Sequence, residues 1–214
     1  MSNKIKSYAK INLFLRVLKK NYKGLHNIQS SVMLLGLHDK INLKKINKNK
    51  DNIEFIGKFK KNINRNLNTI SKSLSLLRKH NLIDQKKRYK ITINKKIPVF
   101  AGLGGGTSNA VFLIKYFLKN KITERLVRIF EKKIGSDFRL FFTNHSFQKN
   151  LTKVSGFKKK YNFYFLLVYP NINSSTREVY SKVKKFNLPI KKDLSKLESK
   201  ESYIKFIKNE KNDL

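Results

Sequence analysis

The sequence predicts an α+β protein. Segments with the two-residue periodicity of strands and segments with the 3.6-residue periodicity of helices follow one another without regular alternation, which favours α+β over a doubly wound parallel sheet. The apolar fraction is 40%, with 16 Phe and 9 Tyr, which is enough to build a core. A length of 214 residues suits one large domain or two small ones.

Strands are expected to dominate the first half of the chain. Residues 6–17 alternate in part between polar and apolar side chains, as a strand with one buried face does. Leu67, Ile70, Leu74 and Leu77 recur at helical spacing, so residues 66–81 should form an amphipathic helix. The other expected strands cover residues 28–37, 40–46, 53–56 and 88–94, with turns at 21–24 and 36–39.

Helices are expected to dominate the second half. An apolar helix should cover residues 107–118, and a second helix, residues 123–134, begins at Thr123, a plausible N-cap. Gly135 and the two residues after it end this helix. The remaining predicted elements are a buried strand at 161–169, closed by Pro170, and helices at 175–186 and 201–208.

The composition predicts a soluble protein. There is no Cys, so disulfides and thiolate metal sites are excluded, and a reducing cytoplasm fits by default. Lys10, Asn12 and Arg16 interrupt every apolar stretch near the amino terminus, so no secretory signal is expected there. The most apolar run, residues 163–169, is far short of the roughly 20 residues that a membrane helix requires.

The strong positive charge has two possible origins. Lys and Arg number 49 against 13 Asp and Glu, a formal net charge of +36, and only 8 of the basic residues are Arg. Lys, Asn and Ile share AT-rich codons, so biased base composition explains the charge; affinity for polyanions, weakened by salt, is the alternative. No specific nucleic-acid partner is expected, because such a footprint should concentrate on one face with Arg available for base edges.

The most informative segment lies between the strand at 88–94 and the helix at 107–118. Glycines there allow positive φ and close backbone approach, so several N–H groups can converge on one oxyanion. The helix adds its positive dipole end, and two hydroxyls can contact phosphate or metal. This is neither a Walker loop nor Gly-x-Gly-x-x-Gly. It predicts a nucleoside triphosphate site, with a capped flexible turn as the alternative. Its residues are Pro98, Val99, Phe100, Ala101, Gly102, Leu103, Gly104, Gly105, Gly106, Thr107 and Ser108.

Three motifs carry a resemblance to a known family: residues 9–15 with 24–30, residues 102–110, and Gly135-Ser136-Asp137. The second, together with Pro98 before it, resembles Pro-x-x-x-Gly-Leu-Gly-Ser/Gly-Ser-Ser/Thr, the hallmark of the galacto-, homoserine, mevalonate and phosphomevalonate (GHMP) kinase superfamily. The three motifs and their order resemble those of a narrower kinase family. Its members phosphorylate the 2-hydroxyl of 4-diphosphocytidyl-2-C-methyl-D-erythritol in non-mevalonate isoprenoid biosynthesis.

The resemblance implies the GHMP-kinase fold, which is α+β. Residues 1–155 are expected to form the ribosomal-protein-S5-domain-2-like ATP-binding domain, and residues 156–214 a ferredoxin-like, substrate-side domain. The last residues, 212–214, resemble a point well inside the family's second domain. This second domain is therefore expected to be incomplete, which leaves the activity of so short a chain open.

The resemblance also implies the reacting residues. Asp137 is expected to take the proton from the acceptor hydroxyl, with Lys10 beside it to stabilise charge on the transferring phosphoryl group. ATP is the implied donor, and Mg²⁺ would arrive with it, so no protein-built metal site is expected. The family prefers Val-Pro where Phe138 and Arg139 follow Asp137, which alters the turn that aims the carboxylate.

The substrate side is implied in the same way. Asn12 and His26 match the family's substrate contacts, with His26 reading the cytosine ring, and Thr176 and Tyr180 fit its substrate-side helix, where an aromatic ring stacks on the base. His26 as a surface turn histidine and Tyr180 as a core residue stay open as alternatives. The other histidines, His38, His80 and His145, have no acidic or histidine partner at ligand spacing and are interpreted as structural.

Other functions remain possible at this point. The same fold could serve another small-alcohol kinase, of the homoserine or mevalonate type. A non-catalytic remnant and a basic nucleic-acid-binding protein are further alternatives. Without the resemblance, Asp137 could simply cap the turn after Gly135, and Lys10 could be an ordinary surface lysine.

Overall fold

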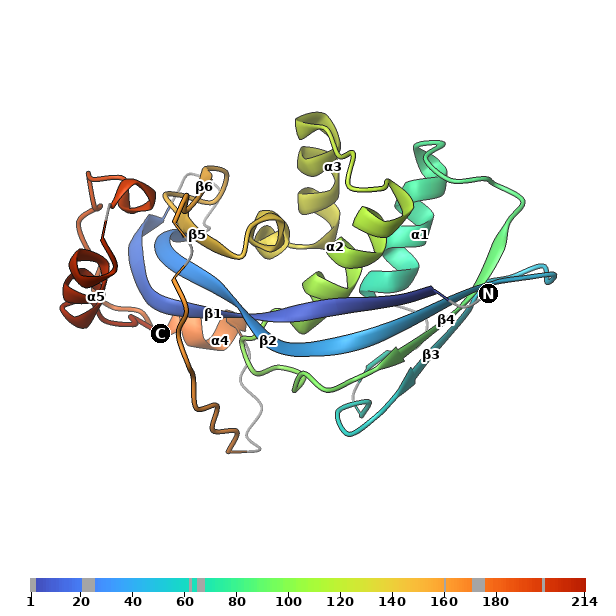
Figure 1. Cartoon of the computed structure of the whole chain (residues 1–214), viewed down its shortest axis with the longest axis horizontal. Coiled ribbons are helices and arrows are strands. Elements are labelled where there is room, and N and C mark those ends of the chain that lie inside the picture. Colours follow the sequence, from blue (N-terminus) through green and yellow to red (C-terminus); the bar gives the residue numbers. More distant parts are fainter. Residues whose placement is uncertain are drawn as a thin grey trace. The chain divides into compact units, whose positions relative to one another are not determined.

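The computed structural model describes residues 3–20, 26–61, 63–64, 68–159, 161–170, 176–197 and 199–214 (Figure 1). Strands and helices are mixed without regular alternation, so the predicted α+β class is confirmed. The elements are β1 (Asn3–Lys20), β2 (His26–Ile46), β3 (Asn52–Ile56), α1 (Thr69–Lys79), β4 (Arg88–Asn94), α2 (Gly105–Phe117), α3 (Glu124–Ile134), the 3₁₀ segment η1 (Ser136–Phe142), β5 (His145–Gln148), β6 (Val154–Gly156), α4 (Thr176–Ser181), the 3₁₀ turn η2 (Leu194–Lys196) and α5 (Lys200–Lys208).

The chain forms two compact units. Unit 1 consists of Met1–Ala9 and Leu35–Phe141, and unit 2 of Lys10–Leu34 and Phe142–Leu214. The long strands β1 and β2 contribute residues to both units. The domain boundary expected at residue 155 stays a prediction.

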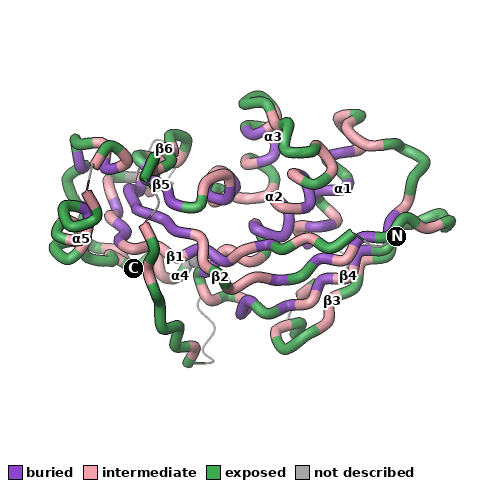
Figure 2. The backbone as a smooth tube through the Cα atoms, in the orientation of Figure 1, coloured by how far each residue is buried: buried purple, intermediate pink, exposed green. Residues whose placement is uncertain are grey.

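Unit 1 is a sheet with helices on one side. β4 pairs antiparallel with β2, from Lys40 opposite Asn94 to Ile46 opposite Arg88, and β3 pairs parallel with β4. Every second side chain of β4 is buried, as the alternation predicts. Figure 1 shows α1 and α2 on the same side of this sheet, and Figure 2 shows buried positions on these helices and on the strands. Their core is Ile41, Leu43, Ile70, Leu74, Tyr89, Ile91, Ile93 and Leu113.

The helix starts of unit 1 follow from local chemistry. Asn68 caps α1, accepting from the amides of Ile70 and Ser71, and Ser71 completes a capping box. The predicted N-cap of α3 is confirmed, because the Thr123 hydroxyl accepts from the amide of Leu126. These bonds satisfy amides that have no acceptor inside the helix.

Unit 2 is built around the carboxyl-terminal part of β1 and the amino-terminal part of β2. β5 pairs antiparallel with β2, and β6 with β5. The last residues of the chain join β1, where the Leu15 amide donates to the Lys211 carbonyl at 3.2 Å. Arg16 also forms a two-pronged ion pair with Glu210, at 2.6 and 2.7 Å. One apolar cluster of unit 2 consists of Phe14, Phe147, Ile190 and Leu194.

The turn predicted at 36–39 and the helix predicted at 175–186 need correction. The turn expected at 36–39 does not interrupt β2, because Asp39 stays in the strand and its carboxylate accepts backbone amides from Lys96 and Ile97. The helix expected at 175–186 ends at Ser181, and the Asn187 amide then donates to the Val17 carbonyl at 2.9 Å instead of continuing a helix. The expected turn at 21–24 lies outside the described residues.

The buried strand expected at 161–169 is wrong. This segment belongs to no strand, and Tyr164 and Leu166 are 100% and 92% exposed. Figure 2 shows most of this segment as exposed. An apolar run indicates burial only where another strand pairs with it, and no described strand does so.

In the described part of the chain, no helix combines the length and the apolarity that a bilayer crossing requires.

Candidate active site

The glycine loop of unit 1 has the backbone of an anion cradle. Gly102 and Gly104 have φ of +70° and +68°, in the left-handed region that a side chain disfavours. Gly104 is the N-cap of α2 and forms no side-chain cap hydrogen bond. The first helical bond runs from the Ser108 amide to the Gly104 carbonyl, at 2.8 Å. Amides at the start of a helix have no acceptor within it and attract anions, so this loop can receive phosphate.

Close packing holds the loop from beneath. A Cβ on Gly105 would lie 3.0 Å from Cγ2 of Ile97 and 3.3 Å from Nζ of Lys95. The carbonyl of Gly106 accepts from the Thr69 hydroxyl at 2.7 Å. Space therefore disfavours a side chain at position 105, whereas the positive φ disfavours one at 102 and 104.

The two hydroxyls after the glycines have different surroundings. Ser108 is 0% exposed and donates to the Tyr8 carbonyl at 2.6 Å, so this hydroxyl fastens α2 to β1. Thr107 is half-buried, and its Oγ1 lies 3.3 Å from where a Cβ on Gly135 would be. Of the two, the Thr107 hydroxyl is the one placed at the turn that leads to Asp137.

Asp137 lies in η1, directly after this turn. Gly135 ends α3 with φ of +153°, and its carbonyl accepts from the amide of Phe138 at 3.1 Å. Phe138 is fully buried, with its ring centroid 5.9 Å from that of Phe130 on α3. The position of the carboxylate-bearing turn is therefore determined by packing against α3 and by its contact with the start of α2.

Arg139 anchors the same turn through ion pairs. Its guanidinium donates to both oxygens of Glu124, at 2.7 and 3.0 Å, and also pairs with Glu131. Hydrogen bonds from Arg139, and then from Arg128, hold the pKa of Glu124 at about 2. Both glutamates lie on α3, so this ion-pair network anchors the turn to that helix.

In unit 2, the predicted Lys10 and Asn12 form one hydrogen-bonded chain. Lys10 is almost fully buried, and its Nζ donates to Oδ1 of Asn12 at 2.7 Å. Asn12 in turn donates to the Ser30 hydroxyl at 2.7 Å, and Ser30 donates to the Phe14 carbonyl at 2.6 Å. The ammonium is therefore held in one place. The predicted approach of Lys10 to Asp137 joins the two units and stays a prediction.

The predicted His26 and Tyr180 are neighbours. Their ring centroids are 5.4 Å apart with an interplanar angle of 30°, and Phe186 adds a third ring 5.9 Å from His26. Tyr180 also packs against Leu15, Val17 and Ile28, so the core alternative describes part of its surroundings. The group presents aromatic surface on which a planar base could stack. The side chain of Thr176 lies outside what the structure describes.

His145 has a buried environment that its sequence position did not indicate. Its Nε2 lies 3.0 Å from both the Ser31 and the Tyr203 hydroxyls, and its ring stacks on Phe157 at 3.7 Å. Burial lowers the pKa of His145 to about 4 and raises that of Tyr203 to about 12. No group of three His, Cys, Asp or Glu side chains within the described ranges could hold a metal. The cluster fits a structural role because its polar atoms lie within hydrogen-bond distance of one another and its rings pack together.

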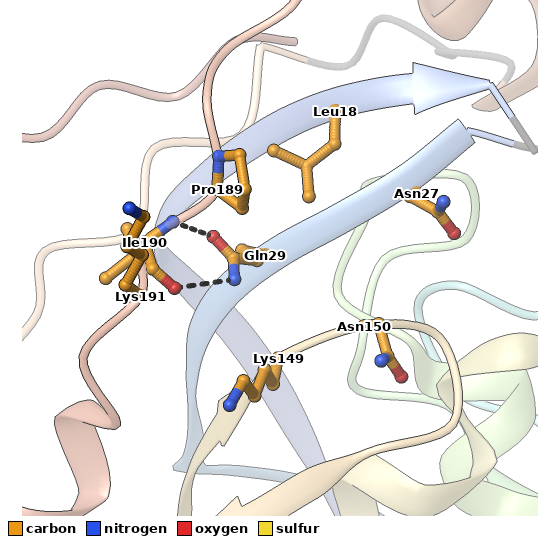
Figure 3. A pocket seen from close by; sticks show the side chains of 8 residues that line it. All are labelled: Leu18, Asn27, Gln29, Lys149, Asn150, Pro189, Ile190 and Lys191. Carbon is orange, nitrogen blue, oxygen red and sulfur yellow. Dashed lines mark hydrogen bonds between the residues drawn. The ribbon is translucent and has the colours of Figure 1, made fainter.

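A separate hollow in unit 2, about 450 Å³, contains none of the predicted site residues (Figure 3). Gln29 on its wall exchanges two hydrogen bonds with the backbone of Ile190, at 2.6 and 3.1 Å. The remaining lining residues are Leu18, Asn27, Lys149, Asn150, Pro189 and Lys191. We assign this open hollow no part in the site.

Comparison with known proteins identifies the family of the chain. Residues 68–138 match the family model of the GHMP kinases N terminal domain. The whole chain is 38% identical to a 4-diphosphocytidyl-2-C-methyl-D-erythritol kinase of Pelagibacter ubique and covers 75% of it. A protein of the same name from Ureaplasma parvum is 32% identical over 84% of the chain and 69% of its own length.

Solved structures agree on the fold. The crystal structure of a 4-(cytidine 5'-diphospho)-2C-methyl-D-erythritol kinase superposes with a TM-score of 0.63 at 19% identity, covering 89% of this chain and 68% of that one. This similarity confirms the GHMP-kinase fold, and the sequence similarity to the named relatives is what distinguishes among its members. The chain belongs to the 4-diphosphocytidyl-2-C-methyl-D-erythritol kinase family, within the GHMP kinases.

Proposed function

We propose that this chain transfers the γ-phosphoryl group of ATP to the 2-hydroxyl of 4-diphosphocytidyl-2-C-methyl-D-erythritol. One observation carries the proposal: the glycine loop and the turn bearing Asp137 are in contact within unit 1, through Thr107 and Gly135. A phosphate cradle beside a carboxylate is the arrangement that phosphoryl transfer to an alcohol requires.

In the proposed reaction, Asp137 accepts the proton of the substrate hydroxyl. The freed oxygen forms a bond to the γ-phosphorus, the bond from that phosphorus to the bridging β–γ oxygen breaks, and ADP leaves. The amides of Gly105 and Gly106 would stabilise the charge that the phosphates carry, and the Lys10 ammonium would stabilise charge on the transferring group.

Mg²⁺ would be bound through the oxygens of the nucleotide. Magnesium in phosphoryl-transfer sites usually keeps several waters and few protein ligands. The Thr107 hydroxyl is a candidate ligand on the loop, whereas the Ser108 hydroxyl is already donated to a backbone carbonyl. Bound magnesium would neutralise phosphate charge, and the protein's own residues would position the two substrates.

The aromatic group at His26 favours a substrate with a planar base. Homoserine and mevalonate carry no ring, so kinases for those alcohols have no use for the paired rings of His26 and Tyr180. A cytidine moiety can stack there and offer its edge to the imidazole. The strong positive charge of the chain would also attract a diphosphate-bearing substrate.

The test measures ADP release from ATP, Mg²⁺ and the cytidine-linked substrate. We expect Asp137→Asn to lose most turnover, on the order of 10²-fold or more, while still binding ATP, and Asp84→Asn, at an exposed surface carboxylate, to behave as wild type. Circular dichroism verifies that each variant is folded. Unchanged turnover in Asp137→Asn would remove this residue from the mechanism. ADP release that is equal with homoserine would contradict the assigned substrate.

A further inference from the structure

A buried ion pair lies directly beneath the glycine loop. Asp39, on β2, is 0% exposed, and Lys95, one residue after β4, is 3% exposed. The Lys95 ammonium donates to Oδ2 of Asp39. Charged side chains are rarely this deeply buried, because removal from water costs several kcal/mol per ion. Such a pair therefore calls for a reason other than stability.

The second oxygen of Asp39 holds the chain that leads into the loop. Oδ1 accepts from the amide of Lys96 at 2.7 Å and from that of Ile97 at 2.9 Å. These two residues immediately precede Pro98, which has no N–H to donate. One carboxylate oxygen thus pins both amides before the loop and determines the direction in which the loop leaves the sheet.

The ammonium of Lys95 lies at the start of α2. Its Nζ is 3.3 Å from the place of a Cβ on Gly105, the first residue of that helix. The amino-terminal end of a helix is already positive, so a cation there is favourable only beside an anion, and Asp39 offsets part of this charge. Burial also lowers the pKa of Lys95, against the opposing effect of Asp39. The positive charge is placed where a bound triphosphate would be stabilised by it.

We propose that Asp39 and Lys95 are positioning residues for the nucleotide. Asp39 fixes the approach to the glycine loop, and the Lys95 ammonium adds a fixed positive charge behind the amides that receive the triphosphate. This inference rests on the proposed nucleotide site. It assigns to the pair an effect on ATP affinity that is separate from the chemistry at Asp137.

The test compares Lys95→Met, the double variant Asp39→Asn/Lys95→Met, and the control Lys90→Met on the exposed face of β4. The double variant has no unpaired buried charge, so it should fold like wild type. We expect Kd and KM for ATP to rise about tenfold or more in it, with kcat and the KM for the alcohol changed by less than about twofold. The control should match wild type.

Two outcomes overturn the inference. One is a double variant with the melting temperature of wild type that also binds ATP as wild type does. The other is a fall in kcat together with a rise in the KM values for both ATP and the alcohol. Loss of a merely structural pair would cause this general impairment. If the wild-type protein is active and the double variant binds ATP with wild-type affinity, only this inference fails. If the wild-type protein binds no ATP, the proposed function fails with it.

A measurement on the wild-type protein serves if the variants do not fold. With lysine side chains labelled for NMR, addition of ATP should shift the side-chain signal of Lys95, because a triphosphate adds charge close to its ammonium. The signal of Lys90 should not move. A Lys95 signal whose chemical shift does not change at saturating ATP would overturn the proposal.

Discussion

Substitution of three glycines by alanine separates the two reasons for glycine in the loop. Gly102 has φ of +70° and nothing within 4 Å of an added Cβ, so Gly102→Ala introduces backbone strain alone. Gly105→Ala introduces a steric conflict alone, with Ile97 and Lys95. Gly36→Ala, in the extended backbone of β2 with nothing within 4 Å, introduces neither and is the control.

The magnitudes follow from these geometries. An L-residue in the left-handed region costs about 1–2 kcal/mol, which corresponds to roughly 5- to 30-fold in ATP affinity if the loop relaxes when empty. If the loop does not relax, the same energy lowers Tm by about 2–8 °C. Overpacking at Gly105 costs roughly 1–3 kcal/mol, offset in part by the helix propensity of alanine. Gly36→Ala should change neither quantity.

Calorimetric titration with a non-hydrolysable ATP analogue measures the affinity, and thermal unfolding measures Tm. The energetic cost of alanine at position 102 must appear as weaker ATP binding, as a lower Tm, or as a combination of the two. If Gly102→Ala binds the analogue and unfolds as Gly36→Ala does, the left-handed conformation at residue 102 is not required, and the anion-cradle geometry is refuted.

Arg139→Met should lower kcat several-fold and destabilise the fold by roughly 1–3 kcal/mol, because the turn bearing Asp137 loses its anchor on α3. Arg128→Met, which breaks only an exposed pair with Glu124, should cost at most about 0.5 kcal/mol; equal effects of the two variants would contradict the anchor. His145 has a folded pKa of about 4, below its unfolded value, so its contribution to stability is complete above about pH 6.5 and is lost progressively toward pH 4, on the order of 3 kcal/mol. Urea unfolding at several pH values should show a steeper acid loss in wild type than in His145→Gln, and parallel curves would refute this assignment.

The elements that could be predicted from the sequence are those with strong local signals. β4 has the predicted bounds, because its alternation is regular and both faces differ clearly in polarity. α3 begins after Thr123 and ends at Gly135, as the capping residues indicate. The glycine loop could also be predicted, because four glycines in five positions between a strand and a helix are typical of a backbone that closely approaches an anion.

Other features could not be predicted. β5 is a short strand of four buried residues, three of them polar, so it shows neither alternation nor an apolar run. Asp39 resembled a turn residue after Gly36, and its partner Lys95 lies 56 positions away. The signal that could have found this pair is weak: an isolated acid among β-forming residues suggests a buried partner but does not say which lysine supplies it.

The sequence by itself determined the periodicities, the helix caps and the glycine loop, because each depends on residues close together along the chain. Only the tertiary structure decided that Asp39 stays inside β2, that His145 is buried beside Ser31 and Tyr203, and that residues 161–170 remain outside the sheet. In each case the outcome depends on which distant backbone or side-chain group satisfies a polar atom or pairs with a strand, and contacts of that kind leave no periodic trace in the sequence.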